Sequence, residues 1–260
     1  MTDQAAKARA FRALHVSANP LLLFNVWDAG STQAVEKAGA RAIATGSWSV
    51  AAANGYADGE KLPLELAMEN LARIVAATSL PVSVDIESGY GDAPELVAQT
   101  VRKAIAAGAI GCNLEDSFPA DGSLRPAEAQ AARIGAARQA ADETGIPFFI
   151  NARTDVFFQK PMPEHDETML KETVRRANLY AAAGADGIFA PGLADPKLIA
   201  RLVQAVPLPI NIMIGGTTPA FDVLAGAGVA RLSHGPSPYR MAMKAVEDAA
   251  RAVFAWTPHA

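Results

Sequence analysis

The chain has 260 residues, of which 50% are hydrophobic and 19% are charged, and its formal net charge is −4. This composition can bury a sizeable core and is not that of a disordered chain. A slightly negative chain offers no basic surface for nucleic acid and no polybasic patch for a membrane. We therefore expect a small-molecule ligand and no nucleic-acid or membrane partner.

Cysteine usage and the N-terminal residues indicate the compartment. Cys112 is the single cysteine, so a disulfide within the chain is excluded, which suits a reducing environment. Residues 1–17 have no apolar segment typical of a signal peptide, and no apolar run is long enough to cross a bilayer. We expect a soluble, cytoplasmic protein.

Short apolar runs alternate with alanine-rich segments along the whole chain. Most runs are preceded either by Gly, which suits a helix C-cap, or by Pro, which suits the start of a strand. The predicted strands are Leu21–Trp27, Arg41–Thr45, Pro81–Ile86, Ile110–Glu115, Pro147–Ala152, Gly187–Pro191, Pro209–Met213 and Val229–Ser233.

Eight such runs with helices between them predict a parallel sheet closed into a (β/α)₈ (TIM) barrel, as a single domain over residues 1–260. The alternative, an open doubly wound sheet, is disfavoured because no GxGxxG turn follows the first run. The last segment, Ser237–Trp256, is predicted to be an amphipathic helix. Its apolar stripe consists of Met241, Ala245, Val246, Ala249, Val253 and Phe254.

Polar residues spaced by two end several predicted strands. These pairs are Asp85 with Glu87, Asn113 with Glu115, and Asn151 with Arg153, and Asn211 lies in the seventh run. Residues i and i+2 of a strand share a face, and barrels carry function at the carboxyl ends of their strands. We therefore expect these side chains to meet at one end of the barrel.

Three carboxylates at one place would repel each other unless a cation lies among them. Mg²⁺ prefers oxygen ligands and uses few direct carboxylates, so the pattern predicts a magnesium site. Arg153 would then bind a substrate carboxylate through its planar fork. Asp116 and Asp155 suit helix caps instead.

Two turns leave alternatives open. The turn Gly46–Trp48 is either an anion-binding set of backbone N–H groups or a small-residue turn in which Trp48 packs. The turn Ser88–Asp92 either lets the backbone approach a ligand closely or is an ordinary turn in which Asp92 caps the next helix.

At this point the chain resembles the isocitrate lyase/phosphoenolpyruvate mutase superfamily. The matching segments are NVWDAGS, TGSWSV, Asp58 in GYADGE, VDIESGYGD, NLEDSFP and NARTD, followed more weakly by Asn211 and RLSHGPSPYR. The resemblance implies a barrel whose last helix is exchanged between subunits of a homotetramer or dimer of dimers. It also implies Mg²⁺, with Mn²⁺ as a substitute, and a small 2-oxo or 2-hydroxy carboxylate that reacts through an enolate.

The resemblance assigns roles to particular positions. Asp85 would bind the metal directly, and Asp58, Glu87 and Glu115 would bind it through water. Gly46, Ser47, Trp48, Asp85, Arg153 and Asn211 are the candidate substrate-binding residues, and Arg153, Asp58 and Glu115 are the candidate catalytic residues.

The chain departs from the family where the acid/base residues are expected. The lyases carry a Cys and a His in the loop after the fourth strand, whereas this loop reads SFPADGSLRP, with only Asp121 and Ser123 as polar candidates. Pro191 stands where the lyases have Glu and the mutase has His, and the usual Asp-x-Asp is Asp85-Ile-Glu87. Cys112 is out of phase with Asn113 and should face the helices.

These observations favour a Mg²⁺-dependent lyase or decarboxylase that acts on an oxaloacetate-like acid through a metal-bound enolate. The alternatives are a phosphoenolpyruvate or carboxyphosphonoenolpyruvate phosphonomutase, a phosphonopyruvate hydrolase, and a barrel that binds a 2-oxo acid without turning it over.

Overall fold

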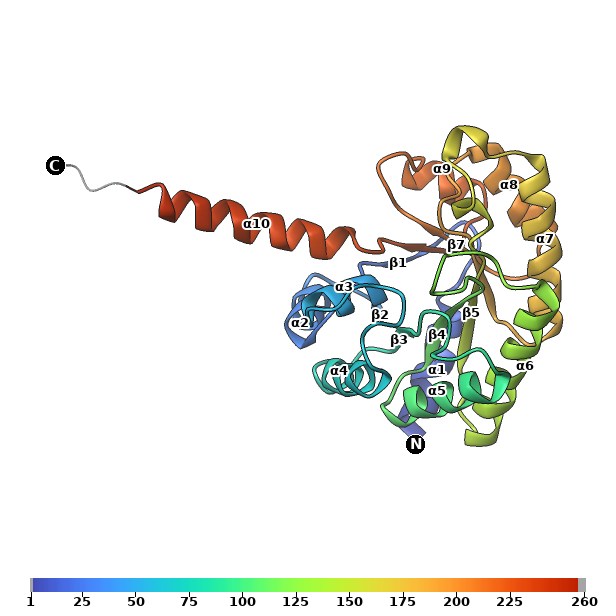
Figure 1. Cartoon of the computed structure of the whole chain (residues 1–260), viewed down its shortest axis with the longest axis horizontal. Helices are drawn as coiled ribbons and strands as arrows, with labels where there is room; N and C mark the ends of the chain where they lie inside the picture. The colour runs from blue at the N-terminus through green and yellow to red at the C-terminus, as the bar shows by residue number, and fades with distance from the viewer. Residues whose placement is uncertain (1, 257–260) are drawn as a thin grey trace.

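The computed structural model describes residues 2–256 and contains the eight parallel strands of a (β/α)₈ barrel (Figure 1). Their order around the sheet is β1-β8-β7-β6-β5-β4-β3-β2. The strands are β1 (Leu21–Leu23), β2 (Ile43–Ala44), β3 (Val82–Asp85), β4 (Gly111–Glu115), β5 (Phe149–Arg153), β6 (Gly187–Phe189), β7 (Ile210–Met213) and β8 (Arg231–Ser233). Each lies within, or one residue beyond, a run predicted from the sequence.

The seam between β1 and β2 closes without a regular ladder, which is why the first predicted strand is too long. The two segments share a single bridge, between Val26 and Thr45. Asn25 interrupts β1, because its side chain donates to the carbonyl of Thr45 (2.9 Å) and accepts from the backbone N–H groups of His234 and Gly235 (both 2.9 Å). One buried amide therefore joins the ends of β1, β2 and β8.

The helices other than α10 cover the outside of the barrel and one of its ends. The α-helices are α1 (Thr2–Ala13), α2 (Ala29–Lys37), α3 (Ser47–Ala53), α4 (Leu64–Ala76), α5 (Pro94–Ala106), α6 (Ala127–Thr144), α7 (Glu167–Ala182), α8 (Pro196–Ala205), α9 (Phe221–Gly226) and α10 (Ser237–Phe254), with 3₁₀ turns at Val156–Phe158 and Met162–Glu164. No helix among these is long and apolar enough to cross a bilayer.

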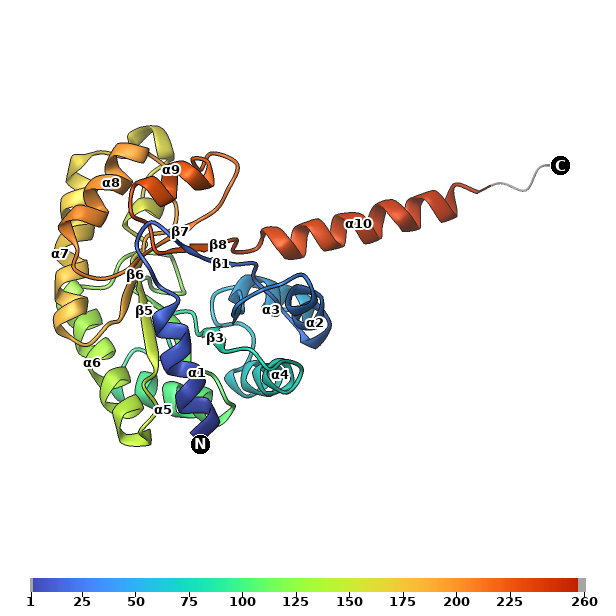
Figure 2. The same cartoon turned by 180° about the vertical axis from the view of Figure 1, so that it is seen from behind.

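Helix α1 lies across the amino-terminal end of the barrel (Figure 2). The ring of Phe11 contacts that of Phe149 edge-on at 5.5 Å, and the ring of His15 stacks on Phe149 at 4.2 Å. Burial and the cation of Arg231 lower the pKa of His15 to about 3, so this imidazole is neutral and serves packing. The opposite end of the barrel is left for the site.

The strand register places the predicted polar residues on the inner face. Asp85 pairs with Asn113, Asn113 with Asn151, and Glu115 with Arg153. Cys112 has the opposite phase and is fully buried in the hydrophobic core outside the strands. Burial accordingly raises the pKa of its thiol.

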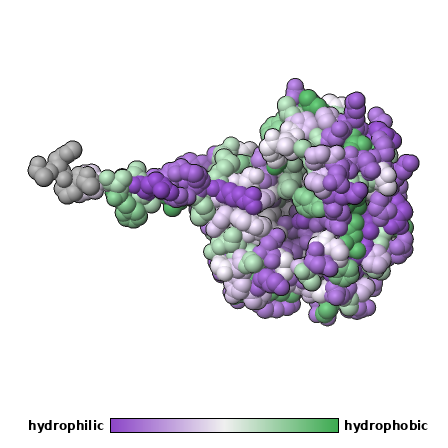
Figure 3. Space-filling model, turned by 45° about the horizontal axis from the view of Figure 1, so that its top comes forward, coloured by the Kyte–Doolittle hydropathy of each residue, from purple (hydrophilic) through white to green (hydrophobic). Residues whose placement is uncertain are grey.

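Helix α10 leaves the barrel instead of covering it (Figure 1). Pro238 is its only buried residue. Met241, Val246 and Val253 are 63%, 61% and 69% exposed, and hydrophobic side chains gather on one side of the helix and toward its end (Figure 3).

The surface that a packed eighth helix would cover is open. It is an apolar groove of about 680 Å³ over β1 and α2, lined by Leu21, Leu22, Phe24, Val35 and His234 among others. Both the groove and the stripe on α10 therefore lack a partner within the described part of the subunit.

Candidate active site

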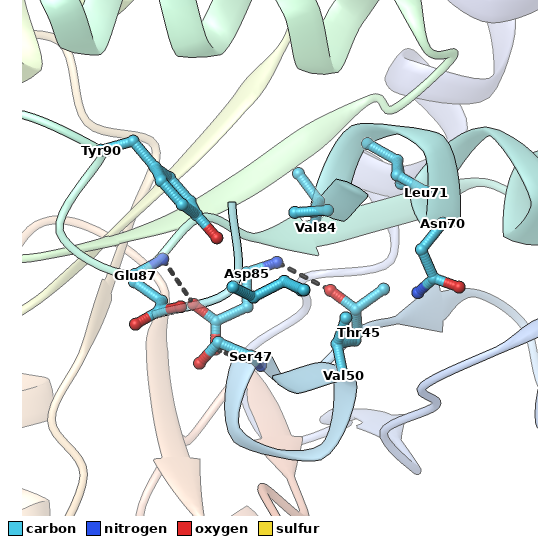
Figure 4. A pocket seen from close by; sticks show the side chains of 11 residues that line it. Thr45, Ser47, Val50, Asn70, Leu71, Val84, Asp85, Glu87 and Tyr90 are labelled. Carbon is cyan, nitrogen blue, oxygen red and sulfur yellow. Dashed lines mark hydrogen bonds between the residues drawn. The ribbon is translucent and has the colours of Figure 1, made fainter. Parts of the chain in front are cut away.

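Asp85 lies at the centre of the polar cluster at the carboxyl ends of the strands (Figure 4). Its Oδ2 accepts hydrogen bonds from the backbone N–H and the hydroxyl of Ser47 (3.3 and 3.1 Å), and its Oδ1 accepts from the N–H of Glu87 (3.2 Å). The N–H of Asp85 donates to the hydroxyl of Thr45 (2.9 Å). The carboxylate is thus fixed between β2 and β3.

The turn Gly46–Trp48 forms the start of α3, for which Gly46 is the N-cap residue. The N–H of Ser47 binds Asp85, as described above. The indole of Trp48 faces α10 instead, where it contacts the ring of Tyr239 at 5.9 Å and lies 4.6 Å beneath the guanidinium of Arg240. The side chain of Trp48 therefore packs, so that substrate binding by this residue would depend on its backbone.

Arg153 lies between two carboxylates. Its Nε and Nη2 donate to Asp155 at 2.6 and 2.9 Å, and its Nη1 lies 2.6 Å from Oε2 of Glu115. A guanidinium has five N–H bonds, and these contacts use three of them. The two that remain, one on each terminal nitrogen, can bind a substrate carboxylate while Arg153 stays in place.

The carboxylates of Asp116 and Asp155 do not cap helices, contrary to the sequence-based interpretation, although Asp155 is the N-cap residue of the 3₁₀ turn Val156–Phe158. Asp116 is fully buried, and its Oδ1 accepts from the N–H of Asp155 (2.9 Å). Its Oδ2 accepts from Arg176 Nη1 (3.0 Å) and from the hydroxyl of Tyr180 (2.7 Å). The buried network from α7 therefore holds Asp155, which in turn orients Arg153.

Glu60 is part of the cluster but was missed from the sequence. Its N–H donates to the carboxylate of Glu87, and its own carboxylate accepts from the hydroxyl of Ser88 (2.6 Å) and the N–H of Tyr90 (2.8 Å). Glu60, Glu87 and Tyr90 have positive φ values of 60°, 52° and 58°. An irregular loop in the left-handed region has no periodic pattern, so the sequence held no signal for this contact.

Two side chains of α6 hold the turn 88–92. Arg133 is 1% exposed and donates to the carbonyls of Gly91 and Asp92 (both 2.6 Å) and of Ser88. Its Nε donates to Gln130 (2.9 Å), which donates to the carbonyl of Glu115 (3.0 Å). This pair joins the turn after β3 to the end of β4.

Asp92 does not cap α5, whose N-cap residue is Ala93 with no side-chain cap. Its carboxylate instead pairs with Arg125 at 2.8 Å. The prediction that Asp92 caps the next helix is therefore wrong. Two arginines hold the turn, because Arg133 binds its backbone carbonyls and Arg125 binds the carboxylate of Asp92.

Burial, and to a smaller extent the neighbouring acids, raises the pKa values of the clustered carboxyl groups. Burial, with smaller effects of Asp58 and Asp85, raises the pKa of Glu87 to about 7. Partial loss of hydration and the Asp85 carboxylate raise the pKa of Asp58, although Asp58 stands exposed at the rim. Burial raises the pKa of Glu115, and the ion pair with Arg153 opposes this shift. The carboxyl groups of the cluster thus outnumber the cations beside them.

A directly coordinated metal cage is absent from the described residues, because no three His, Cys, Asp or Glu side chains there are close enough to share one ion. Mg²⁺ does not need such a cage, since it keeps several waters and uses one or two direct carboxylates. Asp85, with Asp58, Glu87 and Glu115 around it, could supply one or two such ligands, with water at the other positions.

Tyr90 adds a hydroxyl that points toward Asp85 and Glu87 (Figure 4). Burial and the carboxylates of Glu87 and Glu60 raise its pKa, so the phenol keeps its proton. A cavity of about 20 Å³, room for about one water, lies beside Ser47, Asp85 and Tyr90. Sequence analysis had singled out the turn but not this residue.

Two predicted features remain, Asn211 and the loop 117–126, of which the first is buried and the second reaches the surface. Asn211 is buried, and its Oδ1 accepts from the hydroxyl of Ser233 (3.3 Å) while its Nδ2 has no partner among the described residues. In the loop 117–126, Asp121 accepts hydrogen bonds from the N–H and the hydroxyl of Ser123 (2.9 and 2.6 Å). Asp121 and Ser123 thus bind each other on the surface, whereas Ser117, at the start of the same loop, lies with its hydroxyl 3.1 Å from Glu115 and 2.9 Å from Asp155.

Comparison with known sequences gives the class of the protein. The sequence profile of the phosphoenolpyruvate phosphomutase family matches residues 11–254, which include the whole barrel. The chain belongs to this family, within the isocitrate lyase/phosphoenolpyruvate mutase superfamily, and it is an enzyme of a group of carbon–carbon lyases and mutases.

Particular relatives narrow the comparison. The chain is 58% identical to a crystal structure from Burkholderia cenocepacia J2315 proposed to be a phosphonomutase, with a TM-score of 0.94 over 96% of this chain and 99% of that one. It is 32% identical to 2-methylisocitrate lyase of Escherichia coli over 92% of this chain and 81% of the lyase.

Two further relatives carry names that bear on ligands. Oxaloacetate decarboxylase of Rhodopseudomonas palustris is 33% identical over 71% of this chain and 63% of that protein. A solved phosphonopyruvate hydrolase in complex with oxalate and Mg²⁺ is 26% identical, with a TM-score of 0.80 over 93% of this chain and 84% of that one.

Proposed function

We propose that this protein is a Mg²⁺-dependent decarboxylase or lyase that acts on oxaloacetate or a similar small 2-oxo acid. The observation that carries the proposal is Arg153, which is held by Glu115 and Asp155 with two N–H donors left beside the acidic cluster. A 2-oxo dicarboxylate would fit this site with one carboxylate on Arg153 and its other oxygens at a metal ion held by the acidic cluster.

Asp85, with Asp58, Glu87 and Glu115 around it, would hold Mg²⁺. When bound, the ion would supply positive charge that stabilises negative charge on the substrate oxygens. The relatives support this assignment, since one is named oxaloacetate decarboxylase and another was solved with oxalate and Mg²⁺.

The reaction we propose needs little from side-chain acids. The bond between the carboxylate carbon and C3 of oxaloacetate breaks, CO₂ leaves, and the electron pair passes into an enolate. Arg153 orients the substrate, and the enolate takes a proton from water to give pyruvate. This chemistry agrees with the loop 117–126, whose Asp121 and Ser123 bind each other and not the site.

The test is direct assay of the purified protein with oxaloacetate, with and without Mg²⁺. Pyruvate and CO₂ should form in equal amounts, faster than Mg²⁺ alone produces them, and EDTA should stop the enzymatic part. Mn²⁺ should replace Mg²⁺. Parallel assays with isocitrate and methylisocitrate should show no turnover, because the loop lacks the lyase acid/base residues.

A second candidate function is phosphonate chemistry. It is favoured by the 58% identity with a protein proposed to be a phosphonomutase. Incubation with phosphonopyruvate, followed by phosphorus NMR, separates the cases. A phosphoenolpyruvate signal would indicate a mutase and free phosphate a hydrolase. Tight oxalate binding without turnover of any substrate would instead indicate a binding protein.

A further inference from the structure

Arg231 is a buried cation that crosses the interior of the barrel. It is 1% exposed, and its Nη2 donates to Oδ1 of Asn113 at 3.1 Å. Asn113 is on β4, which lies opposite β8 in the eight-stranded order. Within residues 2–256 the Nε and Nη1 of Arg231 have no hydrogen-bond partner, and the guanidinium lies 5.9 Å from the centre of the Phe11 ring. Burying such a charge is costly, so its retention calls for a role.

Arg231 determines which way the amide of Asn113 points. An asparagine amide can usually be placed in either of two orientations. Arginine has donors only, so the Asn113 atom that faces Arg231 must be the oxygen. The same oxygen accepts from Nδ2 of Asn151 at 2.9 Å. Two donors on Asn113 Oδ1 leave its NH₂ group to point elsewhere.

Asn113 also lies beside the acidic cluster. It pairs in register with Asp85 on the neighbouring strand, and it precedes Glu115 by two residues on the same face. When they are ionised, the carboxylates of Asp85, Glu87 and Glu115 accept hydrogen bonds but cannot donate them. Ser83 on the same face of β3 pairs with Gly111, one step further from the carboxyl ends, so Asn113 is the amide donor level with Asp85.

We propose that Asn113 is a substrate-binding residue whose NH₂ group donates to an oxygen of the carboxylate ligand, and that Arg231 is the positioning residue that fixes this orientation. The inference rests on the proposed function, because it takes the ligand to be an oxo acid or oxalate bound at Asp85 and Arg153. The NH₂ group of Asn113 would favour ligands that place an acceptor oxygen beside Asp85.

The first test is Asn113→Asp, studied by calorimetry with Mg²⁺ alone and with oxalate in the presence of Mg²⁺. The change replaces NH₂ by an oxygen at nearly constant volume, and Arg231 remains as a partner for the new carboxylate. Mg²⁺ should still bind, at least as tightly as to the unchanged protein, whereas oxalate affinity should fall by about tenfold or more, because a hydrogen bond to a charged ligand is lost.

A pair of substitutions at Arg231 tests the positioning role. Arg231→Met removes the donor and frees the amide of Asn113 to turn over, so oxalate affinity should fall several-fold. Arg231→Lys keeps a buried donor that cannot accept, so it should retain most of that affinity. A purely structural role would lower the unfolding temperature of both variants and leave oxalate affinity unchanged in the folded protein.

The outcomes separate the two proposals. Failure of the unchanged protein to bind oxalate with Mg²⁺ would overturn the proposed function and this inference together. If the unchanged protein binds oxalate with Mg²⁺ and folded Asn113→Asp binds oxalate within twofold of the same affinity, the inference alone would be overturned. Equal loss of oxalate affinity in Arg231→Lys and Arg231→Met would overturn the positioning role.

Discussion

Glu87 is a buried carboxyl whose protonation couples the site to the stability of the fold. Its pKa is raised from 4.5 to about 7, mainly by burial. The folded chain then holds this proton more tightly than the unfolded chain, so the stabilisation is complete below pH 4.5 and is lost as the pH rises through 7. Without metal, this one group should lower the free energy of unfolding by up to about 3 kcal/mol across that range.

Thermal unfolding of the metal-free protein as a function of pH measures this effect. Glu87→Gln should flatten the decline in stability above pH ~5. Mg²⁺ should stabilise the unchanged protein more at high pH than at low pH, because the ion and the proton compete for the same carboxylates. A Glu87→Gln profile that parallels the original would show that Glu87 is ionised throughout.

Arg153 is expected to tolerate no conservative replacement. Arg153→Lys replaces a planar group that binds Asp155, Glu115 and the substrate at once with a single ammonium group. We expect kcat/KM to fall by about tenfold or more, since the charge-assisted bonds lost are worth ~1.5–3 kcal/mol each. The matched control is Arg102→Lys, at an exposed pair with Glu143. Equal activity of the two variants would remove Arg153 from the site.

Cys112 should have no part in catalysis. The side chain is fully buried among the residues outside the strands, and its raised pKa keeps it a thiol. Cys112→Ala should lower the free energy of unfolding by about 1 kcal/mol through lost packing. Steady-state kinetics should give an unchanged kcat. A large loss of kcat in the folded variant would mean that Cys112 faces the inside of the barrel.

Among the elements, the turn after β3 depends most on a neighbouring helix. Arg133 holds three carbonyls of this turn, in which Tyr90 has a positive φ that is unfavourable without such support. Arg133→Met should let the turn relax and displace Glu87. Mg²⁺ affinity should fall about tenfold by calorimetry, as it does when groups that orient metal ligands are removed. The amides of residues 87–92 should exchange faster with solvent.

Arg138→Met is the control for that prediction. Arg138 belongs to the same helix but binds Asp186 and the carbonyl of Phe148, away from the acidic cluster. Its loss should lower stability and leave Mg²⁺ affinity as it was. If both variants weaken Mg²⁺ binding equally, the effect comes from α6 as a whole and not from the clamp on the turn.

The sequence predicted the regular elements well because their patterns are periodic. Apolar runs bounded by Gly or Pro located all eight strands, and spacing by two assigned Asp85, Asn113 and Arg153 to one face. The closure of the barrel was not predictable in this way. Asn25 joins β1 to the end of β2 through one side-chain hydrogen bond and to the segment after β8 through two more, and no local pattern signals such a role.

The same limit applies to the site. The carboxylates were found because they follow strands, whereas Glu60 and Arg133 act from a loop and from the inward side of a helix. Asp116 was interpreted as a cap because a short acid after a strand is typical of one. Its actual partners, Arg176 and Tyr180, are distant in sequence, and only the packed fold brings them together.

At the scale of the whole molecule, we expect α10 of one subunit to pack in the open groove over β1 and α2 of a second copy of the chain. The stripe of Met241, Val246 and Val253 matches in character a groove lined by Leu21 and Phe24. We propose exchange of α10 within a symmetric homotetramer or dimer of dimers. A chain ending after Pro236 should then lose both its assembly and much of its stability, because every groove would stay uncovered.

Light scattering and thermal unfolding of the full-length and shortened chains measure this. The full-length protein should have the mass of an oligomer, and the shortened chain that of a monomer with a lower unfolding temperature. A full-length monomer at micromolar concentration would contradict the exchange. An oligomeric shortened chain would show that other surfaces hold the subunits together.

The contacts of Tyr239 and Arg240 with Trp48 bear on how the enzyme would behave on dilution. These contacts attach the first turn of α10 to α3, and α3 begins at Ser47, which binds Asp85. A helix that loses its partner is free to swing, and its motion would be transmitted to the residue that orients the central carboxylate. Specific activity would then decrease as the protein is diluted. A rate measured only on a dilute sample would underestimate the specific activity of the assembled enzyme.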